Sequence, residues 1–280
     1  MLPSELETIA SQVRRDIIRM IANAKSGHPG GSLGCADFLV ALYFEILSAK
    51  PENFTQTGKG EDMFFLSNGH ISPVWYSVLA RKGYFSIEEL ATFRMLHSRL
   101  QGHPTTAENL PGIRVASGSL GQGLSVAIGA AIAKKIDQDP NIVYVLTGDG
   151  ELNEGQNWEA ILFASANKVD NLIAIVDYNK KQIDGSTDDV CALGDLKAKF
   201  QAFDWNVLEM DGNNMQDILH IMKIAQSNLF KATPICILMH TKMGNGVDFM
   251  TGTHKWHGTP PNEEQTERAL AQLEETLGDY

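Results

Sequence analysis

The stretch that decides the fold covers residues 141–179 and reads NIVYVLTGDGELNEGQNWEAILFASANKVDNLIAIVDYN. It begins with a continuous apolar run that ends in glycine (141–148), and it closes with a second apolar run (171–179). Uninterrupted apolar runs of this length are typical of strands buried on both faces of a parallel sheet. Residues 157–168, between the two runs, have the periodicity of a helix. The stretch therefore predicts a strand, a crossover helix and a second strand parallel to the first.

The same alternation continues along the chain. It predicts further strands at residues 62–67, 204–212 and 233–241, and further helices at residues 36–47, 123–137, 215–227 and 261–277. A long amphipathic helix opens the chain, with Ser4 as its expected N-cap and Gly27 just past its end. The expected class is α/β, with a mostly parallel sheet flanked by helices. Because no linker or repeat interrupts the pattern, we expect a single domain over residues 1–280.

The composition limits the classes of partner. The chain has 280 residues, 43% of them hydrophobic, and a net charge of −11. This charge argues against nucleic acid and anionic membranes, but not against an anionic small molecule. The three cysteines, Cys35, Cys191 and Cys236, are too widely spaced for a disulfide framework or a zinc site. Without a signal peptide or an apolar run approaching about 18 residues, we expect a cytoplasmic protein that does not enter the membrane.

Polar residues follow the two strands of the opening stretch. Gly148, Asp149 and Gly150 end the first strand and Asn179 ends the second, with 28 residues between Gly150 and Asn179. If the strands are neighbours, these residues converge at the sheet edge where ligands of α/β proteins bind. Their oxygens form an incomplete site for Mg²⁺ or Ca²⁺, which water or the phosphates of a ligand must complete. Gly-Asp-Gly alone is equally compatible with a plain β-turn; the asparagine after the next strand favours a metal and a diphosphate.

Three histidines each follow a glycine directly. They are His28 in SGHPGGSLG, His70 in SNGHIS and His103 in LQGHPT. Each pair alone is compatible with ordinary loop punctuation, because glycine and proline interrupt regular structure in any protein. With only 8 histidines in the chain, the recurrence indicates imidazoles carried on tight turns.

These motifs together resemble a known family. The Gly-Asp-Gly and downstream asparagine resemble the thiamine diphosphate-binding motif, and residues 8–260 are similar to the diphosphate-binding half of transketolase. The resemblance is carried by SGHPGGSLG, LSNGH, LQGHP, SGSLGQGLSVAIGAA, GDGELNEG, VDYNKKQIDG and HTKMGNGV with KWHG. The segment RRDIIRMIANAKSGHPGGSLG most resembles the split transketolases, in which two genes encode the two halves.

The resemblance implies roles for four histidines. His70 would contact the diphosphate of the cofactor. His28 and His103 would hold the C1 hydroxyl and the carbonyl oxygen of a ketose donor. His257, in KWHG, would reach both the diphosphate and the reacting oxygens. A neutral imidazole both donates and accepts hydrogen bonds near pH 7, which suits proton movement around a carbonyl.

The resemblance also implies a cofactor cradle and a metal site. The further cofactor-binding positions would be Gly118, Leu120, Gly148, Asp149, Gly150 and Asn179. Asp149, Asn179 and the backbone carbonyl of Lys181 would bind Mg²⁺ or Ca²⁺. Glu154 would complete the catalytic set, buried between the two cofactor sites of a dimer. Two positions depart from the family pattern: Met63 stands where an arginine is common, and Lys181 stands where a hydrophobic residue is common.

The implied activity is transfer of a two-carbon ketol unit from a ketose or its phosphate to an aldose or its phosphate. The partners would be a C-terminal, pyrimidine-binding transketolase subunit and a second copy of this chain, because the family's second α/β unit has no counterpart here. One alternative is a subunit of another thiamine diphosphate enzyme of the 2-oxo-acid dehydrogenase type. His28 and His103 argue against it, since a 2-oxo acid has no C1 hydroxyl. A second alternative is a non-catalytic cofactor-binding subunit.

Overall fold

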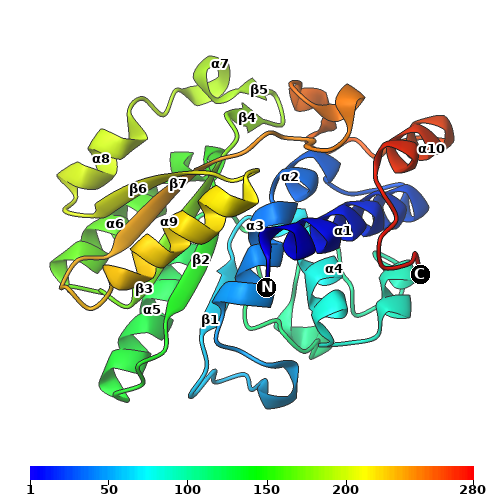
Figure 1. Cartoon of the computed structure of the whole chain (residues 1–280). Coiled ribbons are helices and arrows are strands. Elements are labelled where there is room, and N and C mark those ends of the chain that lie inside the picture. Colours follow the sequence, from blue (N-terminus) through cyan, green and yellow to red (C-terminus); the bar gives the residue numbers. More distant parts are fainter.

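A five-stranded parallel sheet forms the centre of the computed structural model, which describes residues 1–280 (Figure 1). The strand order is β1-β2-β3-β7-β6, and every pair of neighbours is parallel. The strands are β1 (Met63–Leu66), β2 (Val143–Gly148), β3 (Leu172–Tyr178), β6 (Asn206–Asp211) and β7 (Ile235–His240). The predicted fold class is confirmed, and each predicted strand is found within two residues of its expected bounds.

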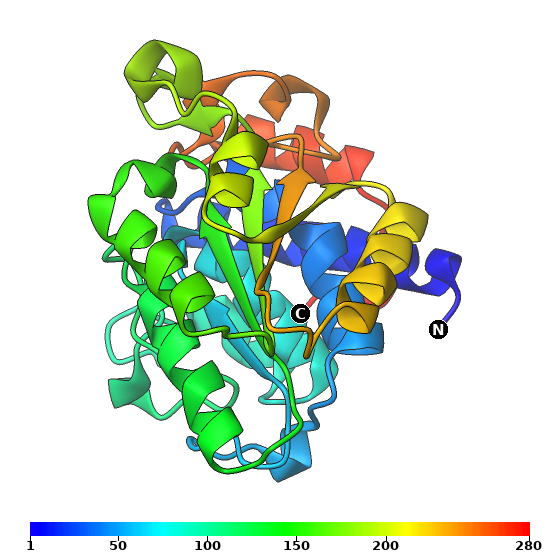
Figure 2. The same cartoon turned by 90° about the vertical axis from the view of Figure 1, so that its left-hand side faces the viewer.

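Helices cover both faces of the sheet. One face carries α1 (Pro3–Ala24), α3 (Ala36–Ala41), α4 (Ser72–Lys82) and α9 (Met215–Ser227). The other face carries α5 (Gly123–Ile136), α6 (Gly155–Ala166) and α8 (Leu196–Ala202). Figure 2 shows this layering, with the green helices on one side of the strands and the blue and yellow helices on the other. The remaining short elements are α2 (Pro29–Gly34), α7 (Thr187–Cys191), α10 (Glu263–Gln272) and the hairpin of β4 (Lys181–Gln182) and β5 (Gly185–Ser186).

The core is divided by the sheet into two clusters. In β2, Tyr144 and Leu146 pack into the cluster of 49 residues that includes α1, α3, α4 and α9. Val143 and Val145 point the other way, into the cluster of 22 residues with α5, α6 and α8. Successive side chains of a strand alternate between the faces of a sheet, so a strand buried on both sides reads as an unbroken apolar run. This is why the opening stretch could be interpreted as a pair of central strands.

The first helix starts earlier than predicted. Ser4 is not its N-cap: α1 begins at Pro3, and Leu2 is the capping residue. Proline suits the first helical position because it has no N–H to satisfy and its φ is already helical. The Leu2 N–H donates to the Glu5 carboxylate at 2.7 Å, so the first turn of the helix satisfies the backbone donor of its own capping residue. The helix ends at Ala24, where Lys25 takes the left-handed conformation.

Two other helices also differ from prediction. The helix expected over residues 36–47 is α-helical only to Ala41 and continues as a π-helical turn, Leu42–Ile46. The helix expected over residues 261–277 ends at Gln272. It begins after Asn262, whose side chain accepts the Gln265 N–H at 2.9 Å. Charge periodicity in the tail thus indicated a helix but did not mark where it stops.

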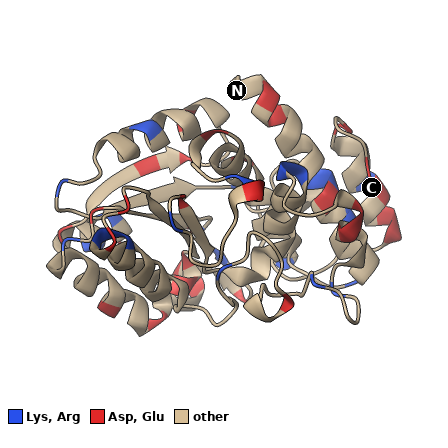
Figure 3. Ribbon diagram, turned by 90° about the horizontal axis from the view of Figure 1, so that it is seen from below, with Lys and Arg blue, Asp and Glu red and all other residues tan.

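The surface carries mixed charge and one exposed thiol. Figure 3 shows acidic and basic residues interspersed along the helices in the view from below. Cys35 and Cys236 are buried, Cys191 is exposed, and all three are free thiols. None of the helices combines the length and hydrophobicity needed to cross a lipid bilayer.

Candidate active site

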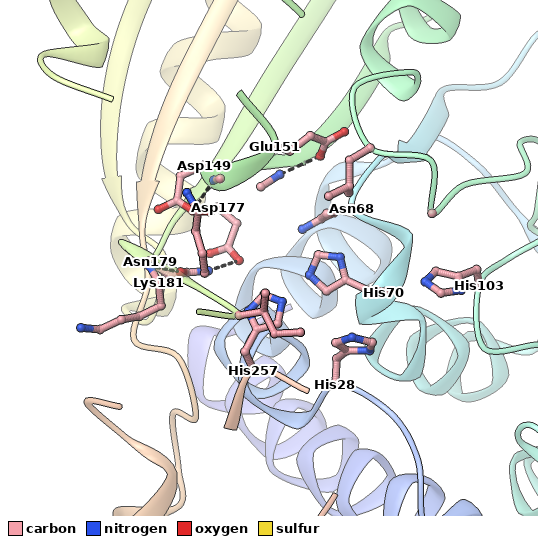
Figure 4. A pocket seen from close by; sticks show the side chains of 16 residues that line it. His28, Asn68, His70, His103, Asp149, Glu151, Asp177, Asn179, Lys181 and His257 are labelled. Atoms are coloured by element: carbon pink, nitrogen blue, oxygen red, sulfur yellow. Dashed lines mark hydrogen bonds between the residues drawn. The ribbon is translucent and has the colours of Figure 1, made fainter. Parts of the chain in front are cut away.

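A cavity of about 300 Å³ opens at the carboxyl edge of the sheet (Figure 4). Figure 4 shows four histidines on one side of it and the polar ends of β2 and β3 on the other. Its lining residues are His28, Asn68, His70, His103, Gly118, Leu120, Gly148, Asp149, Gly150, Glu151, Asp177, Asn179, Lys181, Gln182, Ile183 and His257. Every residue predicted for the site from the sequence is in this set except Glu154.

Strand pairing brings together the residues predicted to bind a metal. β2 and β3 are neighbours, and Gly148 lies opposite Asp177 in their register. The two oxygens of Asp149 accept the N–H of Gly150 at 2.7 Å and the N–H of Lys180 at 2.6 Å. The predicted convergence of Asp149 with the end of the next strand is therefore confirmed.

The short β4–β5 hairpin extends this wall of the cavity. The Lys181 N–H donates to the Asn179 side-chain oxygen at 2.8 Å, which fixes the start of the hairpin beside the end of β3. A Cβ at position 150 would lie 2.9 Å from Cγ of Gln182, so a larger residue there would displace the Gln182 side chain from the cavity wall. No three His, Cys, Asp or Glu side chains gather in a metal-binding cluster. A cation here would need backbone carbonyl, amide and ligand oxygens in addition to Asp149.

The four histidines come from four separate segments. His28 caps α2, His70 lies in the short turn before α4, His103 lies in the following loop, and His257 follows the turn His254–Trp256. The ring centroids of His28 and His70 are 5.1 Å apart, those of His70 and His257 also 5.1 Å, and those of His28 and His103 6.4 Å. The recurrence of Gly-His in the sequence thus marked side chains that meet in one place.

Two glycines next to these histidines are required by close packing. A Cβ at Gly69 would lie 2.4 Å from Oγ of Ser117 and 2.7 Å from N of Gly118. Gly118 itself has a φ of +113°, and a Cβ there would lie 2.6 Å from the His103 ring. Glycine is the residue that accepts both the left-handed backbone and the close approach. The loops before α4 and α5 can therefore touch across the cavity.

The histidines are held neutral. Burial, followed by the proximity of His257, Arg94 and His103, lowers the pKa of His28 to about 4. Burial is also the main cause that lowers the pKa of His70, His103 and His257. All four imidazoles are therefore uncharged near pH 7, which leaves each ring with one donor and one acceptor nitrogen.

Two buried carboxylates in the cavity were not predicted. Asp177 lies on β3 beside Asp149, and burial together with Asp177 raises the pKa of Asp149 to about 7. Glu151 is 3% exposed, and burial raises its pKa as well. The alternation of side chains along β3 could have indicated Asp177, because its position falls within a strand expected to be buried on both faces. A charged residue in such a strand is rarely there for packing.

Glu151 connects three loops of the cavity. Its Oε1 accepts the Gly121 N–H at 2.7 Å and also the Ser67 hydroxyl. Its Oε2 accepts the Gly148 N–H at 3.0 Å. One carboxylate therefore holds the end of β1, the loop before α5 and the end of β2 in a fixed arrangement.

Several buried polar atoms in the cavity wall lack a partner within the protein. They are His28 Nδ1, Asn68 Oδ1, Gln182 Nε2 and His257 Nδ1. Buried polar groups are normally hydrogen-bonded, so such a group calls for a ligand or water. The cavity has unpaired hydrogen-bond donors and acceptors in its wall, and carboxylate and amide oxygens at the ends of β2 and β3. This combination fits a polar, anionic cofactor bound together with a cation.

The other candidates lie outside the cavity. Glu154 is exposed, and it stands at the start of α6. Met63 is buried in β1. His97 and His220, which belong to none of the motifs quoted above, are both exposed.

Comparison with known proteins gives consistent matches over nearly the whole chain. Residues 6–278 match the family model described as transketolase, thiamine diphosphate binding domain. The chain is 39% identical over 272 residues to an apulose-4-phosphate transketolase subunit from Phocaeicola vulgatus, covering 97% of this chain and 95% of that one. It is 40% identical over 271 residues to a 6-deoxy-6-sulfo-D-fructose transketolase subunit from Clostridium sp. (strain MSTE9), covering 96% of each chain.

Among solved structures, transketolase from Campylobacter jejuni superposes with a TM-score of 0.90 at 35% sequence identity. The match covers 98% of this chain but only 43% of that one. The chain thus spans about two fifths of the length of that transketolase, and nearly the full length of the two subunit relatives.

Proposed function

The chain belongs to the transketolase family through its thiamine diphosphate-binding domain, and we propose that it is the diphosphate-binding subunit of a two-subunit transketolase. It transfers a two-carbon ketol unit from a ketose to an aldose, each free or phosphorylated, when joined to a second subunit that binds the pyrimidine end of the cofactor. Two relatives of nearly equal length are named as transketolase subunits, which supports this division of labour. Residues 1–280 then act as one diphosphate-binding domain.

The observation that carries the proposal is the composition of the cavity wall. Four neutral histidines face a sheet edge that carries Asp149, Asn179 and the Lys181 backbone. In their ionised forms Asp149 and Asp177 would repel a diphosphate, because like charges repel. A divalent cation, Mg²⁺ or Ca²⁺, on Asp149, the Asn179 amide oxygen and the Lys181 carbonyl would resolve this conflict, with phosphate oxygens completing its coordination.

The remaining cavity residues hold the rest of the cofactor. His70 and His257 lie 5.1 Å apart and offer ring nitrogens to the diphosphate. Gly118 and Leu120 line the cavity on the side where the aminopyrimidine would lie. When bound, thiamine diphosphate supplies the electron sink for breaking the carbon–carbon bond beside the ketose carbonyl.

On the donor side, His28 and His103 orient the ketose. Both imidazoles are neutral, so each can accept a hydrogen bond from a hydroxyl at one nitrogen and donate a hydrogen bond to an oxygen at the other. A 2-oxo acid has a carboxylate in place of that hydroxyl, and a carboxylate has no proton to donate to the acceptor nitrogen of a neutral imidazole. This observation favours a ketose over the oxo-acid alternative.

A second copy of this chain is the proposed partner of the α5–α6 face. Val126 and Ile136 on α5 and Leu162 and Phe163 on α6 are each at least 41% exposed. A hollow between the two helices is lined by Ser125, Ile128, Gly129, Ile132, Gln156, Glu159, Ala160 and Phe163. Large apolar side chains exposed on two adjacent helices of a globular protein favour an interface. A two-fold axis there would bury Glu154, at the start of α6, between the two copies.

Mixing experiments test the proposal. The purified chain, with thiamine diphosphate and Mg²⁺, is expected to show no ketol transfer between a ketose donor and an aldose acceptor. Addition of the pyrimidine-binding subunit is expected to restore cofactor binding and activity together, in a complex with two copies of each chain. Robust transfer by the chain alone would contradict the two-subunit function. Cofactor binding without any transfer by the complex would favour a non-catalytic binding subunit.

A further inference from the structure

We infer that Arg94 is a positioning residue for the donor side of the cavity: its guanidinium lies between the loop of His28 and the loop of His103 and fixes the two imidazoles relative to each other. The inference rests on the proposed function, which assigns these histidines to the ketose. Arg94 does not line the cavity, so it acts through the histidines and not on the substrate.

The contacts of Arg94 reach both loops. Its Nη1 donates to Oγ of Ser26 at 2.8 Å, two residues before His28. On the other side, the guanidinium packs against Gly102, directly before His103. A Cβ at Gly102 would lie 2.6 Å from the Arg94 Cζ. One side chain therefore sets the spacing of two segments that are far apart in the sequence.

The backbone of Arg94 is strained. Its φ is +59°, in the left-handed region that residues other than glycine seldom adopt. The conformation is held by the Arg94 N–H, which donates to the Leu100 carbonyl at 2.9 Å. Such a conformation persists where the surroundings hold it in place.

The charge of Arg94 is not neutralised by a carboxylate. Arg99, in the same loop, pairs with Glu89 at 2.8 Å, whereas Arg94 forms no ion pair and its buried Nε has no hydrogen-bond partner. An unpaired guanidinium disfavours a second positive charge nearby.

The groups that face the two histidines can be named. After burial, the Arg94 charge is the next cause that lowers the pKa of His103. For His28, burial and His257 come first, and Arg94 and His103 follow. His70 packs against His28, and the Tyr76 hydroxyl interacts with Arg94. Arg94 is thus the one permanent charge acting on both His28 and His103. By keeping both rings neutral, it leaves each able to accept a hydrogen bond from a hydroxyl.

The first test uses Arg94→Gln in the complete complex with the partner subunit, thiamine diphosphate and Mg²⁺. The kcat/KM for the ketose donor is expected to fall about 10- to 100-fold, while cofactor affinity stays within about threefold of the wild type. The acidic limb of the pH profile should move to higher pH, because the imidazoles now protonate more readily. Arg94→Lys should restore the pH profile but only part of the kcat/KM, because lysine keeps the positive charge but lacks the planar guanidinium group. Arg99→Gln, in the same loop, is the control and should change neither the kcat/KM nor the pH profile.

The second test does not depend on activity. Nuclear magnetic resonance titration of the histidine rings in the full chain without cofactor should show the pKa of His28 and His103 higher in Arg94→Gln than in wild type and Arg99→Gln. Unchanged ring titrations, or a loss of cofactor affinity equal to the loss of turnover, would overturn the inference. If the wild-type complex lacks ketol transfer, the proposed function fails, and the ring titration still decides whether Arg94 acts on the histidines.

Discussion

At the scale of single residues, burial and the proximity of other charged or ionisable side chains keep the four histidines of the cavity neutral. The ring centroid of His28 lies 5.1 Å from that of His70, 5.7 Å from that of His257 and 6.4 Å from that of His103. Rings this close cannot carry several positive charges at low dielectric, and burial penalises even one. The same residues would titrate near pH 6.5 in an unfolded chain. Their chemistry in the folded protein is therefore linked to its stability.

This linkage predicts a pH dependence of stability. The pKa of His28 is lowered to about 4, so between pH 6.5 and pH 4 the unfolded chain binds a proton that the folded chain does not. Stability should fall with decreasing pH over this window, by up to about 1.4 kcal/mol per pH unit from this group. In His28→Asn the difference in unfolding free energy between pH 7 and pH 5, measured with urea, should be smaller than in the wild type.

The comparison reports on His28 and on its neighbour His70, whose pKa His28 also lowers. The raised pKa of Asp149 contributes with the opposite sign in both proteins. The exposed His97→Asn is the control and should match the wild type. Equal pH dependence in all three proteins would contradict a neutral, buried His28.

The metal site gives a second prediction. Asp149→Ala should weaken Mg²⁺-dependent thiamine diphosphate binding by about 100-fold or more, because the one carboxylate placed on the cation is lost. The melting temperature should change by only a few degrees, since the lost hydrogen bonds from Gly150 and Lys180 are offset by relief of repulsion with Asp177. Calorimetry on the complex measures the first effect. The exposed Asp137→Ala is the control, and unchanged cofactor affinity in Asp149→Ala would remove Asp149 from the metal site.

The sequence revealed the residues whose chemistry follows a recognisable pattern. Asp149, Asn179 and the Gly-His residues could be predicted because strand ends and glycine turns place them at one edge. Asp177 and Glu151 were missed, since each is one polar residue beside a more conspicuous motif. Arg94 was missed because its importance lies in a left-handed backbone and an absent ion partner, which no local sequence pattern encodes.

At the scale of elements, Glu151 decides how three loops meet. Glu151→Gln replaces one acceptor oxygen by a donor that faces an N–H or a hydroxyl, so at least one bond among those from Ser67, Gly121 and Gly148 is lost. The variant should lose about 1–3 kcal/mol of stability. Amide exchange at Gly121 and Gly148 should accelerate. Asn153→Asp, in the same turn but exposed, is the control. Unchanged amide exchange at Gly121 and Gly148 in Glu151→Gln would show that Glu151 does not hold the three loops together.

Elements were predictable in proportion to their regularity. The central strands were found because burial on both faces leaves an unbroken apolar run. The β4–β5 hairpin has two residues per strand, too few to produce any periodicity. The true start of α1 at Pro3 depends on the reach of the Glu5 side chain, which composition does not reveal.

At the scale of the whole molecule, the α5–α6 face should control self-association. Phe163→Glu would place two charges near the proposed two-fold axis, where they cannot be solvated, and should weaken dimerisation by about 100-fold or more. Sedimentation of the full chain measures this. Phe230→Glu is a matched control, because Phe230 is 55% exposed, like Phe163 at 50%, but lies on the turn before β7. A dimer that survives Phe163→Glu would place the self-contact elsewhere.

The distribution of thiols has a practical consequence. Cys35 and Cys236 are buried with raised pKa values, so neither offers a reactive thiolate, whereas Cys191 is exposed. Cys191 ends α7, which follows directly on the hairpin that carries Lys181 into the cavity wall. A maleimide dye should therefore label the native chain at one position without mutagenesis. Its fluorescence anisotropy would then follow, in real time, how the hairpin responds as cofactor and partner are added.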